Sequence, residues 1–157
     1  MEEERQHAEE PNLEEEMEER QNAKAPKDLW EEPSGEMDET ARRVIGAAIE
    51  VHRAIGPGFP EIVYERALCI ELQLRGIVFE QHPNVTVTYK GFNVGGGQLD
   101  ILVSGVVLEL KAVYMLLPVH RAQLEAYLKA SGHRLGLLLN FGTSVLTIRR
   151  VIHSQNP

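Results

Sequence analysis

The sequence predicts an α/β domain in which helices flank a mixed β-sheet, preceded by an acidic N-terminal extension. The charge is unevenly divided, because residues 1–40 contain 16 acidic and 4 basic residues and residues 41–157 contain 8 acidic and 12 basic residues. In the second part, apolar residues recur first at helical spacing and then at the alternating positions typical of strands. Its 117 residues are the usual size of one domain with a hydrophobic core.

The chain is expected to comprise three regions. Residues 1–37 form an acidic extension whose few apolar side chains cannot offset chain entropy, so we expect it to be disordered. Residues 38–152 form the folded domain, and residues 153–157 form a short tail.

Composition excludes several classes of protein. A single cysteine, Cys69, excludes a disulfide scaffold and a multi-cysteine metal site. No apolar run approaches the ~18 residues of a membrane helix, so we expect no membrane span. The charged N-terminus lacks the apolar core of a signal peptide, and we therefore expect a cytoplasmic or otherwise intracellular protein.

Three helices follow from apolar periodicity and from helix-ending residues. The first begins near Asp38 and is ended by Gly56-Pro57-Gly58. The second runs from about Pro60, a favoured first-turn residue, to about Arg75. The third covers about 119–130.

The remaining segments are expected to be strands and turns. A nearly continuous apolar run at 135–141 is typical of a strand at the centre of a sheet. Ser104-Gly105 predicts a tight hairpin turn, and Asn140 and Gly142 are interpreted as turn residues. The other expected strands are 77–89 with a break near His82-Pro83-Asn84, 92–94, 98–103 after a triple-glycine break at 95–97, 106–113 and 145–152.

Charged side chains in the predicted central strands are the first candidates for chemistry. Glu109 and Lys111 alternate with apolar residues, so they point to one face of a strand. Asp100 in the preceding strand can face them across the hairpin. Two carboxylates and the Leu110 carbonyl would form an oxygen-rich site suited to Mg²⁺ or Mn²⁺. A buried salt bridge without chemistry explains the same spacing, and the pattern alone does not separate the two.

Two further pairs lie on predicted helices. Glu61 and Tyr64 are three residues apart and share a face of the second helix. Glu61 alone is also explained by a favourable interaction with the helix dipole. Gln123 and Tyr127 share a face of the third helix, where a surface or packing pair is the simpler interpretation.

Together, these residues resemble a known family. Gly58-x-x-Glu61-x-x-Tyr64 resembles the motif that gives the GxxExxY proteins their name, and these are part of the PD-(D/E)xK nuclease superfamily. The resemblance covers about residues 38–152 and implies a restriction-endonuclease-like core. It extends through the stretches VIGAAIEVHRAIGPG, LDILV, VLELKAV, HRAQLEAYLKASG and LGLLLNFG.

The resemblance implies a catalytic site. Asp100, Glu109 and Lys111 match the superfamily signature, and Glu61 matches the helix acid that often completes the metal site. It implies hydrolysis of DNA phosphodiester bonds by a water that bound Mg²⁺ or Mn²⁺ activates.

The resemblance also has departures and further implications. Gln123 and Tyr127 resemble the Q-x3-Y element of the RecB-like branch, which helps to organise the site. Leu99 replaces the proline of the signature, Pro60 replaces a leucine-like residue, and Gln98 stands where relatives often carry an arginine.

Two alternative functions remain open for the domain. A non-catalytic module that binds nucleic acid or protein could use the same fold, and a structural protein could bury the same polar cluster. A protein partner or a homodimer is compatible with both the nuclease and the interaction module. The acidic extension could compete with DNA phosphates for basic groups of the domain, bind Mg²⁺ weakly, or serve only solubility.

Overall fold

The structure, a computed structural model, describes residues 35–154. The helix α2 begins at Gly35, three residues before the predicted start of the domain, and the prediction of disorder for residues 1–34 lies outside the described part. The elements in chain order are α2 (Gly35–Ile55), α3 (Glu61–Leu74), β1 (Glu80–Gln81), β2 (Asn84–Tyr89), β3 (Phe92–Gln98), β4 (Ile101–Val103), β5 (Val106–Lys111), α4 (Pro118–Ser131), β6 (Leu135–Asn140) and β7 (Thr147–Ile152).

A five-stranded sheet with the strand order β1-β4-β5-β6-β7 forms the centre of the domain. The pair β5 and β6 is parallel, and the other three pairs are antiparallel. The parallel pair needs a crossover, which α4 supplies. The predicted mixed sheet with flanking helices is therefore confirmed.

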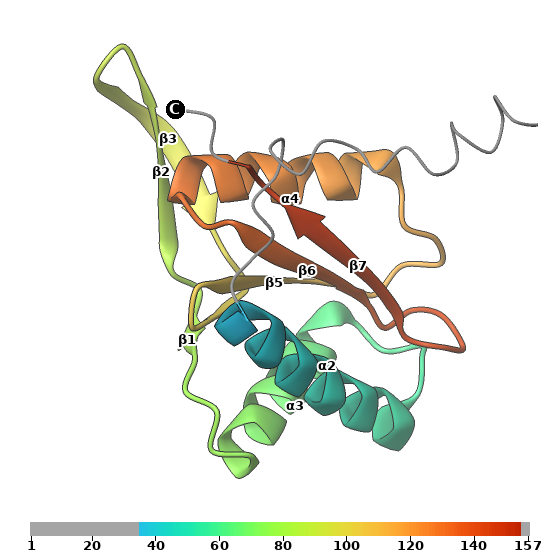
Figure 1. The fold of residues 1–157 in the computed structure, drawn as a ribbon. Helices are drawn as coiled ribbons and strands as arrows, with labels where there is room; N and C mark the ends of the chain where they lie inside the picture. The colour runs from blue at the N-terminus through green and yellow to red at the C-terminus, as the bar shows by residue number, and fades with distance from the viewer. Residues whose placement is uncertain (1–34, 155–157) are drawn as a thin grey trace, which may run out of the picture. The chain divides into compact units, whose positions relative to one another are not determined.

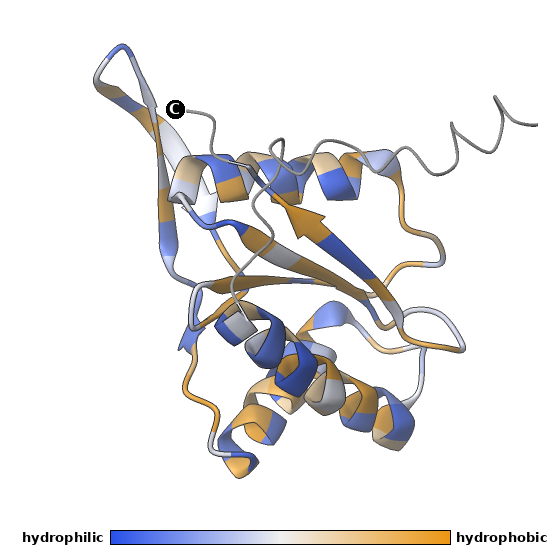
Figure 2. Cartoon of the chain, viewed as in Figure 1, coloured by the Kyte–Doolittle hydropathy of each residue, from blue (hydrophilic) through white to orange (hydrophobic). Residues whose placement is uncertain are grey.

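Helices cover both faces of this sheet. Figure 1 shows α2 and α3 on one side and α4 on the other. In β5, Val106, Leu108 and Leu110 belong to the cluster on the α2 and α3 side, whereas Val107 belongs to the cluster on the α4 side. A strand buried on both faces reads as a continuous apolar run, and Figure 2 shows β5 and β6 as mostly hydrophobic beside helices of mixed character.

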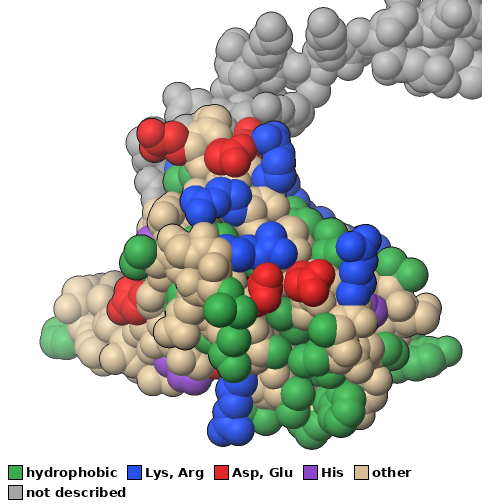
Figure 3. Space-filling view, turned by 90° about the horizontal axis from the view of Figure 1, so that it is seen from below, with side chains coloured by type: hydrophobic (Ala, Val, Ile, Leu, Met, Phe, Trp, Pro, Cys, Tyr) green, Lys and Arg blue, Asp and Glu red, His purple; other side chains and the backbone are tan. Residues whose placement is uncertain are grey.

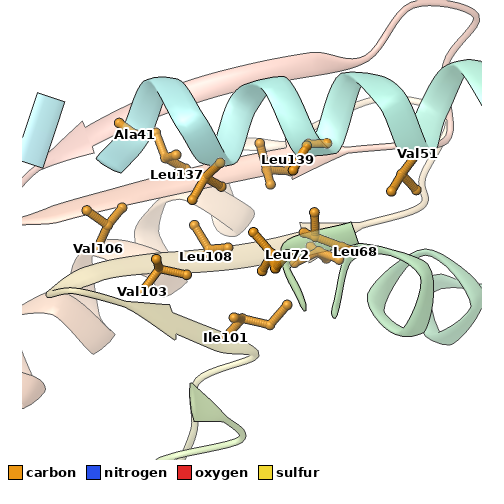
Figure 4. Packing of buried hydrophobic residues seen from close by; sticks show 14 of the residues in the cluster. Ala41, Val51, Leu68, Leu72, Ile101, Val103, Val106, Leu108, Leu137 and Leu139 are labelled. Atoms are coloured by element: carbon orange, nitrogen blue, oxygen red, sulfur yellow. The ribbon is translucent and has the colours of Figure 1, made fainter. Parts of the chain in front are cut away.

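The larger cluster fills the space between α2, α3 and the sheet. Ala41 and Val51 come from α2, and Leu68 and Leu72 come from α3. Figure 4 shows these side chains directed toward Leu108 and its neighbours on β4, β5 and β6. This packing fixes α3 against the strand that carries Glu109 and Lys111.

The strands β2 and β3 form a separate two-stranded hairpin. The predicted triple-glycine break is wrong, because Gly95, Gly96 and Gly97 all lie within β3. Glycine is needed here for close approach: a Cβ on Gly96 would lie 1.8 Å from the carbonyl oxygen of Val85. The register shifts between Val87, which pairs with Gly95, and Thr88, which pairs with Asn93, so the strand bulges at Val94, next to the glycines.

The predicted strand 98–103 is also divided. Leu99 and Asp100 separate β3 from β4, which places Asp100 at the junction of the hairpin and the central sheet. Among residues 35–154, no helix combines the length and the apolar character that crossing a membrane requires.

Candidate active site

Strand β5 carries two charged side chains into a largely buried position. Glu109 and Lys111 share a face with Val107, which places them on the α4 side of the sheet. Lys111 Nζ lies 3.2 Å from Glu109 Oε1, and the two side chains are 16% and 6% exposed. An ion pair of the kind that the salt-bridge interpretation predicts is therefore present between Glu109 and Lys111.

Asp100 is held beside them by both its side chain and its backbone. Its Oδ2 accepts a hydrogen bond of 2.7 Å from the backbone N–H of Leu110, the residue between Glu109 and Lys111. Its carbonyl oxygen accepts a bond of 2.9 Å from the N–H of His82. The N–H of Leu99 donates to the carbonyl oxygen of Pro83 at 3.0 Å. The backbone at Asp100 is thus tied to the segment that joins β1 and β2.

Glu61 stands in the first turn of α3, where Tyr64 fixes the preceding loop. The Tyr64 hydroxyl donates to the carbonyl oxygen of Gly56 at 2.6 Å and accepts from the N–H of Phe59 at 3.2 Å. The ring of Tyr64 is fully buried and stacks on Phe141, with 4.8 Å between the ring centroids. Tyr64 therefore sets the loop that leads into Glu61.

The three carboxylates influence one another. Burial, reinforced by Asp100 and opposed by Lys111, raises the pKa of Glu109 to about 7. Burial also raises the pKa of Asp100, although the Leu110 N–H opposes the rise. The pKa of Glu61 is raised by burial and then by the charge of Asp100. One lysine does not balance this concentration of acidic groups, and a further cation would lower all three pKa values.

The donor set fits such a cation. Glu109 Oε2 is buried without a hydrogen-bond partner, which leaves an oxygen lone pair for a ligand to use. Within residues 35–154, no three His, Cys, Asp or Glu side chains are grouped closely enough to hold a metal. Magnesium does not need three, because it commonly binds one or two carboxylates and keeps several waters.

A comparison with protein families identifies the group to which this architecture belongs. Residues 38–151 match the model of the PD-(D/E)XK nuclease superfamily. The chain belongs to the PD-(D/E)XK nuclease superfamily. No curated protein matches the chain. One similar solved structure, titled "Crystal structure of SSO0001", shares 16% sequence identity at a TM-score of 0.44, and the match covers 72% of this chain and 67% of that chain.

The two residues on α4 are placed differently within this PD-(D/E)XK domain. Gln123 is exposed, and Tyr127 is partly buried in the cluster on the α4 side. The Tyr127 ring packs against β3, where a Cβ on Gly97 would lie 2.6 Å from its hydroxyl oxygen. Within residues 35–154, neither Gln123 nor Tyr127 forms a hydrogen bond or an ion pair with the carboxylates of the candidate site.

Sequence patterns did not identify a second polar group that supports the site. Glu65, one turn after Glu61 on α3, is buried. It accepts a bond of 2.8 Å from Gln81 Nε2, and its Oε1 lies 2.5 Å from His82 Nε2. His82 in turn bonds the backbone of Asp100. A buried acid among the apolar residues of α3 was the available signal, but its partners lie 16 residues away or more.

Asn140 also has a larger role than turn chemistry. Its buried side-chain amide donates to the carbonyl oxygen of Val113 at 2.9 Å and accepts from the N–H of the same residue at 3.0 Å. A Cβ on Gly142 would lie 2.4 Å from the Val113 carbonyl oxygen. The interpretation of Asn140 as a simple turn residue is therefore incomplete, because its amide ties the chain after β5 to the end of β6.

Proposed function

We propose that this protein is a metal-dependent nuclease that hydrolyses phosphodiester bonds in DNA. The observation that carries the proposal is the buried, unpartnered Oε2 of Glu109, next to Asp100 and Lys111. An unpaired buried carboxylate oxygen costs free energy that a cation would recover. Membership of a nuclease superfamily supports a nucleic-acid substrate.

Asp100 and Glu109 would hold Mg²⁺ or Mn²⁺ together with the carbonyl oxygen of Leu110, and Glu61 would add a ligand directly or through water. These are hard oxygen donors, which both ions prefer. When bound, the metal supplies Lewis-acid polarisation of a phosphate oxygen and acidifies a water. The bond from the Leu110 N–H would keep the Asp100 carboxylate oriented.

Lys111 would position the attacking water and stabilise the negative charge that develops on the phosphate. Its ammonium group is well placed for this because Glu109 holds it in a largely buried position. The nucleophile would be water, so no covalent intermediate with the protein is needed. Gln123 and Tyr127 would orient the site and the substrate from α4.

We also propose the finer assignment to the GxxExxY group and to the RecB-like branch of the superfamily. The geometry of Tyr64, which fixes the loop before Glu61, supports the first assignment. The position of Gln123 and Tyr127 on the helix that covers the Glu109 face supports the second.

Metal titration by calorimetry, paired with cleavage assays on single- and double-stranded DNA and on RNA, tests the proposal. We expect Mn²⁺ and Mg²⁺ to bind the wild type, and binding and cleavage to be lost together in Asp100→Asn/Glu109→Gln. Glu50→Gln, which changes an exposed acid on α2, is the matched control and should retain both.

Two other results would count against the proposal, and a third would extend it. If the wild type bound neither metal, the carboxylates would have a structural role and would not be metal ligands. Binding without cleavage of any substrate would favour the interaction module on the same fold. Cleavage only after addition of a partner, or a dimer in light scattering, would support the predicted protein partner or homodimer.

A further inference from the structure

The β2–β3 hairpin extends beyond the rest of the domain. Figure 1 shows it projecting past the end of α4 and away from the central sheet. Only its root is buried, where Val85 packs in the cluster on the α4 side and Gly97 meets Tyr127. The seven residues of β3 span about 23 Å at the usual rise of a strand, which equals roughly seven base steps of duplex DNA.

Two aromatic side chains occupy the tip of this hairpin. Tyr89 and Phe92 are directly opposed across the strands, so they share one face, and they are 61% and 74% exposed. Lys90 and Gly91 connect them with positive φ values of 48° and 82°, the conformation of a tight type I′ turn. Lys90 Nζ lies 5.4 Å from the centre of the Tyr89 ring. The tip is therefore a short, well-defined turn with exposed rings and one cation.

The charge of the hairpin favours an anionic partner. No acidic residue occurs from Pro83 to Leu99, in a chain whose net charge is −8. The outer surface of the domain on the side of α2 and α3 has a different charge pattern, because Figure 3 shows basic and acidic side chains interspersed there. An acid-free segment with exposed rings and a lysine offers a nucleic acid both stacking surfaces and a phosphate contact.

The hairpin also leads directly to the candidate active site. Its second strand ends at Gln98, and Asp100 follows after one residue. A nucleic-acid strand at the carboxylates could therefore continue along the hairpin to its tip. Addition of a strand from a second protein is less suited to this element, because the bulge at Val87/Thr88 interrupts the regular edge of the hairpin.

We propose that the β2–β3 hairpin binds unpaired bases of the nucleic-acid substrate by stacking them on Tyr89 and Phe92. Lys90 contacts a neighbouring phosphate. The inference rests on the proposed nucleic-acid substrate of the site, but it does not depend on the metal or on cleavage.

The test is fluorescence anisotropy with a short labelled single-stranded DNA in the presence of EDTA. We expect Tyr89→Ala/Phe92→Ala to weaken binding by at least about tenfold, since each base–aromatic stack makes a substantial contribution. Thr86→Ala/Thr88→Ala, which changes exposed residues on the opposite face of the same strand, is the matched control and should bind as the wild type does. Tyr89→Phe/Phe92→Tyr keeps both rings and should retain binding.

Salt dependence separates stacking from charge. The aromatic variant should weaken binding at every salt concentration without changing the slope of log Kd against log salt concentration. Lys90→Gln should reduce that slope. Thermal unfolding of each variant should match the wild type, because the tip residues are exposed.

Equal affinity of the wild type and Tyr89→Ala/Phe92→Ala, or no binding by the wild type, would overturn the proposal. So would a wild-type dimer that the aromatic substitutions convert to a monomer, because the tip would then be a protein contact. Cleavage assays on the Asp100 and Glu109 variants report separately on the nuclease. A metal-dependent nuclease with unaltered binding in the tip variants would refute the hairpin inference alone.

Discussion

The ion pair between Lys111 and Glu109 predicts how removal of the lysine affects activity and stability. Because the pKa of Glu109 is already about 7, this carboxyl can accept a proton when its partner is removed. We therefore expect Lys111→Met to abolish cleavage and to lower the free energy of unfolding by only about 1 kcal/mol near neutral pH, instead of the ~3–5 kcal/mol of a buried charge left without its partner. Activity assays and urea denaturation measure the two effects.

Lys129→Met is the control for this substitution, because it removes an exposed lysine on α4. It should leave both activity and stability near the wild-type values. A large loss of stability in Lys111→Met at neutral pH would instead indicate a structural ion pair.

The raised pKa of Glu109 also predicts a pH dependence of stability. In the folded state the group holds its proton up to a pH of about 7, whereas its ordinary pKa is 4.5. The folded protein therefore binds more protons in this interval, and stability falls as the pH rises from about 4.5 through about 7. We expect Glu109→Gln to remove this slope and to stabilise the metal-free protein above pH 7 by an amount on the order of 3 kcal/mol at most.

Denaturation curves across this pH range, recorded with EDTA, test the prediction. Added Mg²⁺ should restore the stability of the wild type at high pH and leave Glu109→Gln unchanged, since a ligand stabilises the state that binds it. A parallel pH profile of the two proteins would show that Glu109 does not carry the effect.

At the scale of elements, Glu65 connects α3 to the segment before β2. It contacts Gln81 and His82, and His82 bonds the backbone of Asp100. We expect Glu65→Ala to lower the free energy of unfolding by about 2 kcal/mol, because it removes charge-assisted hydrogen bonds from a buried position. Cleavage should also fall, since Asp100 would lose part of its support.

The same helix provides the control. Glu71→Ala removes a more exposed pair with Arg75 and should cost less than about 1 kcal/mol, with activity retained. Equal effects of the two substitutions in urea denaturation would show that Glu65 has no special positioning role.

The helices and strands differ in how well their positions could be predicted from the sequence. Periodicity predicted the order of helices and strands, because each pattern depends on neighbours a few residues apart. The continuity of β3 through three glycines was missed, since it depends on the close approach of Val85 and on a bulge. The four charged residues of the candidate site were proposed from a family pattern and remain a prediction. The contacts of Glu65 and Asn140 join segments that only the fold brings together.

At the scale of the whole molecule, the uneven charge predicts that the N-terminal segment affects binding. Residues 1–40 contain 16 of the 24 acidic residues. We expect deletion of residues 1–34 to increase affinity for DNA at low salt, because it removes negative charge that repels phosphates. The difference should diminish at high salt, where such interactions are screened.

Anisotropy measurements on the full chain and the truncated chain across a salt series test this expectation. Replacing the acidic residues of 1–34 by their amides in the full-length chain is the control, and it should reproduce the effect of the deletion. Identical affinities at low salt would exclude a role of this charge in binding.

The contacts of Tyr64 have a consequence for how relatives of this protein are recognised. Its hydroxyl closes the loop from Gly56 to Phe59, and Gly58 adopts a φ of 112°, which favours glycine. Two of the three residues in the motif therefore maintain shape, and only Glu61 has a part in the proposed chemistry. If Asp100, Glu109 and Lys111 act as proposed, a descendant that had lost them would still be selected to keep the glycine and the tyrosine. The glycine and the tyrosine would then mark ancestry, and the three charged positions would distinguish an active enzyme from an inactive relative.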